Sequence, residues 1–84
     1  MDEIARALGA YRACIDFPED VTEDELRQEA VAMLGHAREG VSLMSLSEDI
    51  AIGLANRLRI TTINHDDCAQ LASALLELVN APRP

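Results

Sequence analysis

Four side chains of this sequence could bind a soft metal ion, and these are Cys14, His36, His65 and Cys68. Their number matches a Cys₂His₂ zinc site, but only His65 and Cys68 stand close together in the chain. Zinc sites of this kind are recognised by two closely spaced pairs of ligands, and the second pair is missing here. We therefore predict no metal site and expect both thiols to be reduced, behaving as small apolar side chains.

The stretch NHDDC, residues 64–68, places a histidine and two acids beside a thiol. These are the components of a cysteine nucleophile with its base, yet neighbouring positions on a helix point in different directions. Asp66 and Asp67 are explained more simply as acids in the first turn of a helix, where the helix dipole favours negative charge. The sequence also lacks a glycine-rich phosphate loop and a G-x-S-x-G elbow. We therefore predict no catalytic residue, no cofactor and no enzymatic activity.

An acid run, IDFPEDVTEDELRQE at residues 15–29, contains seven carboxylates and one arginine. The helix dipole accounts for Glu23, Asp24 and Glu25 if a helix begins at this point. The other four acids leave two interpretations open, either a solvated loop or an acidic surface that binds a basic partner. In the second interpretation the acids take the place of phosphates and two apolar residues add desolvation. The predicted partner-binding residues are Asp16, Phe17, Glu19, Asp20, Val21, Asp24 and Glu29.

The charge of the chain limits what that partner can be. Fifteen acids and seven bases give a net charge of −8, and all seven bases are arginines scattered singly along the sequence. Binding to phosphate backbones or to anionic lipid needs clustered cations, so we predict no direct contact with nucleic acid or membrane. The predicted partner is a protein with a basic surface.

Residues 47–72 have the outline of a DNA-binding helix-turn-helix motif, with small residues in the first helix and a short turn. The helix that would read the DNA begins NHDDCAQ, and its two carboxylates would repel phosphates. This stretch therefore gives no support to DNA binding.

The spacing of apolar residues predicts four helices. The first spans residues 2–16 and is ended by Pro18. The second begins at Thr22, where TEDE forms a capping box, and ends at Gly40 or as early as Gly35. The third is capped by Ser45 or Ser47. After an extended connection at residues 59–64, a fourth helix is capped by Asn64 or Asp66 and runs to about Val79, followed by a frayed tail at residues 79–84.

These helices predict an all-α fold, a compact bundle of about four helices in one domain over residues 1–84. The apolar stripes of the second and third helices are clearest, and they consist of Leu26, Ala30, Met33, Leu34 and Ala37, and of Leu46, Ile50, Leu54 and Leu58. Gly53 lies in the third helix and is expected to allow a close neighbour.

The fourth helix is apolar over most of its circumference, which indicates burial on several sides. It is either the central helix of the bundle or the source of a dimer contact through Leu76 and Val79. Tyr11 and Phe17 are the only aromatic residues, so the core is thin and self-association would add stability. The sequence leaves a monomer and a homodimer equally open.

No apolar run reaches the length of a membrane span and no secretory signal is recognisable, so we expect a cytoplasmic protein. The motifs indicate no particular family. Elimination and charge favour a small acidic inhibitor that blocks a basic nucleic-acid-handling protein, as immunity proteins and phage anti-defence proteins do. The alternative is a dimeric adaptor, regulatory protein or phage assembly accessory protein that acts through an apolar helix face.

Overall fold

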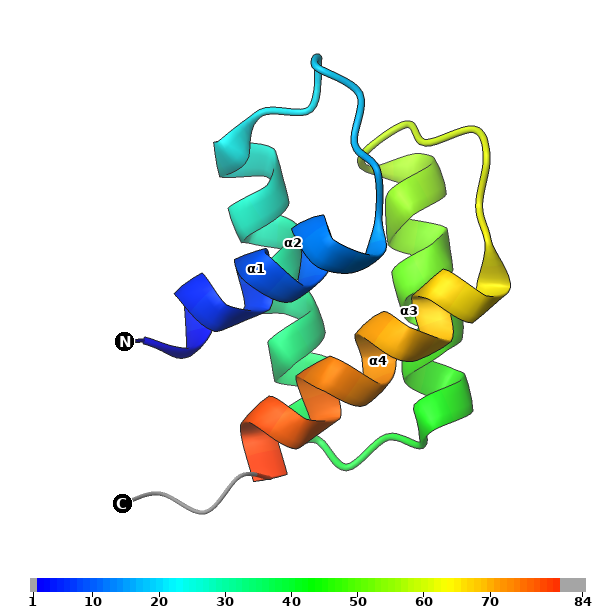
Figure 1. Ribbon diagram of the computed structural model, residues 1–84. Helices are drawn as coiled ribbons and strands as arrows, with labels where there is room; N and C mark the ends of the chain where they lie inside the picture. The colour runs from blue at the N-terminus through cyan, green and yellow to red at the C-terminus, as the bar shows by residue number, and fades with distance from the viewer. Residues whose placement is uncertain (1, 81–84) are drawn as a thin grey trace.

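The computed structural model describes residues 2–80, which form four helices: α1 (Glu3–Cys14), α2 (Glu23–Arg38), α3 (Leu43–Asn56) and α4 (His65–Asn80). Residues 2–80 contain no strand, so the all-α prediction is confirmed. α2 and α3 run side by side in opposite directions, and α1 and α4 cross over them (Figure 1). Across residues 2–80, every helix is too short or too polar to cross a membrane.

α1 begins where the sequence predicts and ends slightly sooner. The Asp2 carboxylate caps the helix by accepting a hydrogen bond from the Ala5 amide at 2.7 Å. Ile15 already has extended backbone angles, although its amide still donates to the Tyr11 carbonyl. Pro18 disfavours helical geometry in the residue before it, and the chain leaves the helix before reaching that point.

α2 follows its prediction closely. The Thr22 hydroxyl accepts a hydrogen bond from the Glu25 amide, and the Glu25 carboxylate accepts one from the Thr22 amide, each at 3.1 Å. This reciprocal pair is the predicted capping box. The helix passes through Gly35 and ends at Arg38, and Gly40 follows with a φ of +83°, the left-handed conformation that glycine adopts readily.

α3 begins earlier than predicted, because its N-cap is Ser42 and not Ser45 or Ser47. The Ser42 hydroxyl accepts a hydrogen bond from the Ser45 amide at 3.1 Å. Ser45 and Ser47 lie inside the helix. The prediction was wrong because Leu43 and Met44, which open the helix, are exposed and therefore stand outside the apolar stripe that marked its beginning.

Asn64 is the predicted cap that the structure selects for α4. Its side-chain oxygen accepts hydrogen bonds from the amides of Asp66 and Asp67, at 2.8 and 3.2 Å. The helix continues to Asn80, so the predicted frayed tail does not begin at Val79. The remainder of that tail, residues 81–84, lies outside the described residues.

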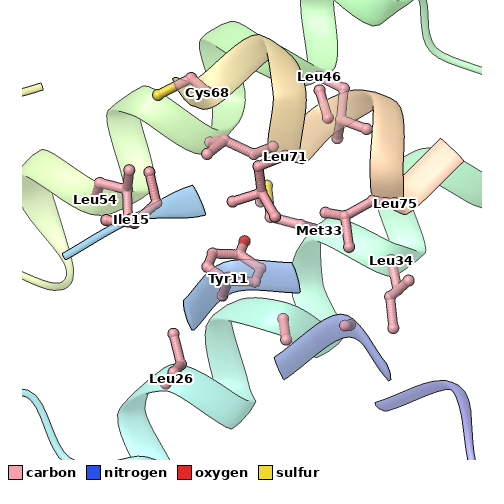
Figure 2. Close-up of a cluster of buried hydrophobic side chains, with 14 of the residues drawn as sticks. Tyr11, Ile15, Leu26, Met33, Leu34, Leu46, Leu54, Cys68, Leu71 and Leu75 are labelled. Carbon is pink, nitrogen blue, oxygen red and sulfur yellow. The ribbon is translucent and has the colours of Figure 1, made fainter. Parts of the chain in front are cut away.

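One apolar core joins all four helices, with Tyr11 near its centre (Figure 2). The predicted stripes of α2 and α3 are buried in full, and so are Ala7, Leu8 and Ile15 of the first helix and its flank. Ile4, near the start of α1, is exposed. The Tyr11 hydroxyl is buried and has no hydrogen-bond partner within residues 2–80.

α4 contacts each of the other three helices, as expected of a central helix. Its residues Cys68, Leu71, Ala72 and Leu75 are buried. Leu76 and Val79 are half-buried and pack against the core of their own chain. The dimer contact proposed for these two residues stays a prediction.

Candidate protein-binding surface

The acid run opens with a loop between α1 and α2, and we call residues 16–24 the acidic loop. The chain is extended at Ile15 and turns between Pro18 and Val21, where the Val21 amide donates to the Pro18 carbonyl at 3.1 Å. The acids predicted to bind a partner in this loop are all exposed, namely Asp16, Glu19, Asp20 and Asp24. The loop therefore presents its carboxylates to solvent.

Phe17 and Val21 anchor the acidic loop to the body of the protein. Both are half-buried and pack against the core, and the Phe17 ring lies 6.4 Å from the Tyr11 ring between centroids. A small groove of about 270 Å³ is lined by Phe17 and Val21, and a second groove of about 600 Å³ lies between Phe17 and the connection from α3 to α4. The two predicted apolar residues thus combine partial exposure with a fixed position.

The seven carboxylates of the acid run divide into two sets in the structure. Glu23 lies 3.6 Å from Arg12 and 3.9 Å from Arg27, and Glu25 and Glu29 each pair with an arginine from the end of α3. Within residues 2–80, the other four acids form no ion pair, and these are Asp16, Glu19, Asp20 and Asp24. The unneutralised charge therefore lies in the acidic loop and the first turn of α2.

Glu29 was predicted to belong to the partner-binding surface, and this prediction was wrong. Its side chain is only 2% exposed and accepts hydrogen bonds from Arg57 Nε at 2.5 Å and Arg57 Nη2 at 2.8 Å. Glu29 lies on the buried side of α2 facing α3, where Gly53 leaves the space that its carboxylate occupies. A Cβ atom at Gly53 would collide with Glu29 Oε1, so the predicted close neighbour of Gly53 is this carboxylate.

Glu25 pairs with Arg59 at 3.0 Å while also capping α2. The hydrogen bond from Arg59, followed by that from the Thr22 amide, lowers the pKa of Glu25 to about 2. Arg59 has a φ of +61°, a conformation that L-residues other than asparagine and aspartate adopt rarely. The ion pair therefore joins the start of α2 to a strained turn at the end of α3.

Sequence reasoning missed Arg57 and Arg59 as partners of the acid run. Glu25 and Glu29 lie one helical turn apart on α2. At the end of α3, Arg59 pairs with Glu25 and Arg57 pairs with Glu29. The repeated pattern of two acids and two cations was visible in the sequence. Matching the two pairs required the packing of α2 against α3, which local patterns do not supply.

The soft metal ligands and thiols are distributed over the molecule. Within residues 2–80, no three histidine, cysteine or acidic side chains converge in a way that could hold a metal ion. His36 contacts Asp49 of α3 through Nδ1 at 3.0 Å, so its side chain is half-buried at a contact between α2 and α3. Burial raises the pKa of Cys68 and of Cys14, whereas an activated thiolate requires a lowered pKa.

The connection between α3 and α4 spans residues 57–64. Helix-turn-helix motifs join their helices through a turn of about 3–4 residues, so this connection is twice as long as that motif allows. Asp66 is exposed at the start of α4, where a recognition helix would approach DNA phosphates. The connection between α3 and α4 therefore lacks the geometry of a helix-turn-helix motif.

Comparison of the chain with known protein families, with curated proteins and with solved structures gives no match.

Proposed function

We propose that this protein is a small cytosolic inhibitor that binds a basic, nucleic-acid-handling protein through its acidic loop. The observation that carries the proposal is the set of four exposed carboxylates without an ion pair within residues 2–80, grouped around the half-buried Phe17 and Val21. Arginines neutralise the other three acids of the run, so the unpaired charge of the run lies within residues 16–24.

Such a loop suits a partner that normally binds phosphates. Exposed carboxylates attract a cationic groove over distances of about 8–10 Å at moderate salt and so speed association. Phe17 and Val21 lie between the acids along the chain and supply apolar surface that loses water on contact. The protein would then inhibit its partner by occupying the groove that nucleic acid uses.

The proposal predicts that removing charge from the acidic loop weakens binding and leaves the fold intact. The test variant is Asp16→Asn/Glu19→Gln/Asp20→Asn, which spares Asp24 because the helix dipole also favours a negative charge at that position. Wild type and variant are immobilised, and basic proteins retained from extracts of the source cells are identified by mass spectrometry. We expect wild type to retain a nucleic-acid-handling protein that elutes with salt and that the variant loses.

A charge-matched control separates a specific surface from general acidity. Glu39→Gln/Glu48→Gln/Glu77→Gln removes the same number of charges from exposed positions outside the acidic loop. It should retain the partner as wild type does, and purified wild-type protein should displace nucleic acid from that partner. Equal retention by all three proteins would show that the loop acids are only a solvated face.

A dimeric adaptor is the second candidate function. The exposed apolar side chains of α3 support it more than those of α4 do. Met44 is 74% exposed and Ile52 is 53% exposed, and the two residues stand two helical turns apart on α3. Large exposed apolar side chains at this spacing are typical of a helix face that contacts another chain. In this candidate function the contact is a second copy of the same chain.

A further inference from the structure

The groove of about 600 Å³ beside the acidic loop lies between two segments that connect helices. One wall follows the end of α1 and the other follows the connection from α3 to α4, and both segments lie at the same end of the molecule (Figure 1). Six of its twelve lining residues are apolar, and these are Ile15, Phe17, Pro18, Leu54, Ile60 and Ile63. It is the larger of the two grooves described beside the acidic loop.

Two of the three charged residues that line this groove are negative. Asp16 and Asp67 line it directly, from the first and second walls respectively. Arg59 is the one cation in the lining, and its guanidinium is held by Glu25. An occupant that enters the groove therefore meets apolar side chains together with two carboxylates that no arginine neutralises, which favours cationic groups beside an apolar side chain.

The backbone of the second wall adds a further constraint. Within residues 2–80, the amides of Thr61, Thr62 and Ile63 donate no hydrogen bond to a backbone carbonyl, and both threonines are exposed. Free backbone amides can donate to the carbonyls of an extended peptide, whereas the carbonyls of a helix are already paired within the helix. The wall thus suits an extended chain more than a helix.

We propose that this groove binds an extended basic segment of the partner protein, which inserts one large apolar side chain between Phe17 and Ile63 with lysine or arginine on either side. The inference rests on the proposed function, because it assumes a basic partner and specifies how that partner is held. The acidic loop would attract the segment, and the groove would fix it in place.

The test uses a synthetic peptide, Lys-Lys-Trp-Lys-Lys, with its termini blocked. The protein contains no tryptophan, so the emission of the peptide reports its own environment. Titration at low salt should shift the emission to shorter wavelength as the indole enters the groove. A peptide of the same charge, Lys-Lys-Ala-Lys-Lys, should bind about tenfold to a hundredfold more weakly, as expected from burial of one large apolar side chain.

Variants of the protein place the binding site. Ile63→Ser removes part of the apolar wall and should weaken binding of the tryptophan peptide about tenfold. Val31→Ser is the matched control, because Val31 is exposed on α2 and lines a different pocket, and it should bind as wild type does. Thr62→Arg adds bulk and positive charge at an exposed position and should also weaken binding, which keeps the test valid if Ile63→Ser fails to fold.

Amide chemical shifts on addition of each peptide distinguish the possible outcomes. Shifts at residues 15–17 and 60–64 with the tryptophan peptide alone support the groove. Equal affinity for both peptides, with shifts confined to residues 16–24, would overturn the groove while leaving the acidic loop as a binding surface. Absence of binding by either peptide at low salt would overturn both the groove and the proposed function.

Discussion

Glu29 keeps a buried charge through one arginine whose own side chain is 53% exposed. The free energy of leaving a charged group buried without a partner exceeds that of a lost neutral hydrogen bond. We expect Arg57→Ala to lower the free energy of unfolding by about 2–3 kcal/mol, less than for completely buried pairs because water reaches the site. Urea unfolding followed by circular dichroism measures this change.

A second substitution, at Glu29, tests whether an unpaired buried charge causes the loss of stability in Arg57→Ala. Adding Glu29→Gln to Arg57→Ala should restore part of the lost stability, because the buried group is then uncharged. Arg27→Ala removes an arginine that pairs with Glu23 at 3.9 Å on an exposed face, and it should change stability by less than about 0.5 kcal/mol. Equal effects of Arg57→Ala and Arg27→Ala would mean that Glu29 gains little from its pair.

Glu29 also shows which roles of single residues can be predicted from the sequence before the fold is known. Thr22 and Asn64 were identified as caps because a cap acts on amides two or three positions away. Glu29 pairs with an arginine 28 positions further along the chain, and local sequence does not reveal such a partner. Its charge and its sequence neighbours alone therefore suggested an exposed side chain. Four of the five predicted binding acids remain at the surface, and the one that does not is the acid with a distant partner.

At the scale of the helix, the start of α3 distinguishes Ser42, which was not among the predicted caps, from Ser45, which was. Ser42 caps the helix, whereas Ser45 supplies the amide that the cap accepts. We expect Ser42→Ala to lower the free energy of unfolding by about 1 kcal/mol. Ser45→Ala should have little effect or add up to about 0.5 kcal/mol, because alanine favours a helix interior more than serine does. Thermal or urea unfolding of the two variants compares them directly.

The reverse order of these two effects would place the helix start at Ser45, as the apolar stripe had indicated. That stripe began at Leu46 because Leu43 and Met44, although apolar, do not face the core. The number of helices and the buried stripes of α2 and α3 were recoverable from periodicity. The first turn of α3 was not, because its exposed apolar residues obscure the pattern.

At the scale of the whole molecule, the open question is whether a second copy covers an apolar face. Leu76 and Val79 were predicted to form a dimer contact, yet both pack against the core of their own chain. A charge at Leu76 would therefore be placed against apolar neighbours even in a monomer. Leu43, Met44 and Ile52 on α3 are the large apolar residues that remain mostly in solvent on that helix.

We expect Leu76→Glu to lower the free energy of unfolding by about 1–3 kcal/mol, because the carboxylate would lose water at a half-buried site. Met44→Glu/Ile52→Glu should leave the stability of the subunit within about 0.5 kcal/mol per site, since both side chains are largely exposed.

Light scattering at high concentration then tests the adaptor function. A wild-type dimer that the α3 variant converts to a folded monomer would support the adaptor, with α3 as its contact. If instead Leu76→Glu gives a stable monomer from a wild-type dimer, the contact lies on α4 and the core at its end must repack. A wild-type monomer at high concentration would remove the dimeric adaptor from the candidate functions.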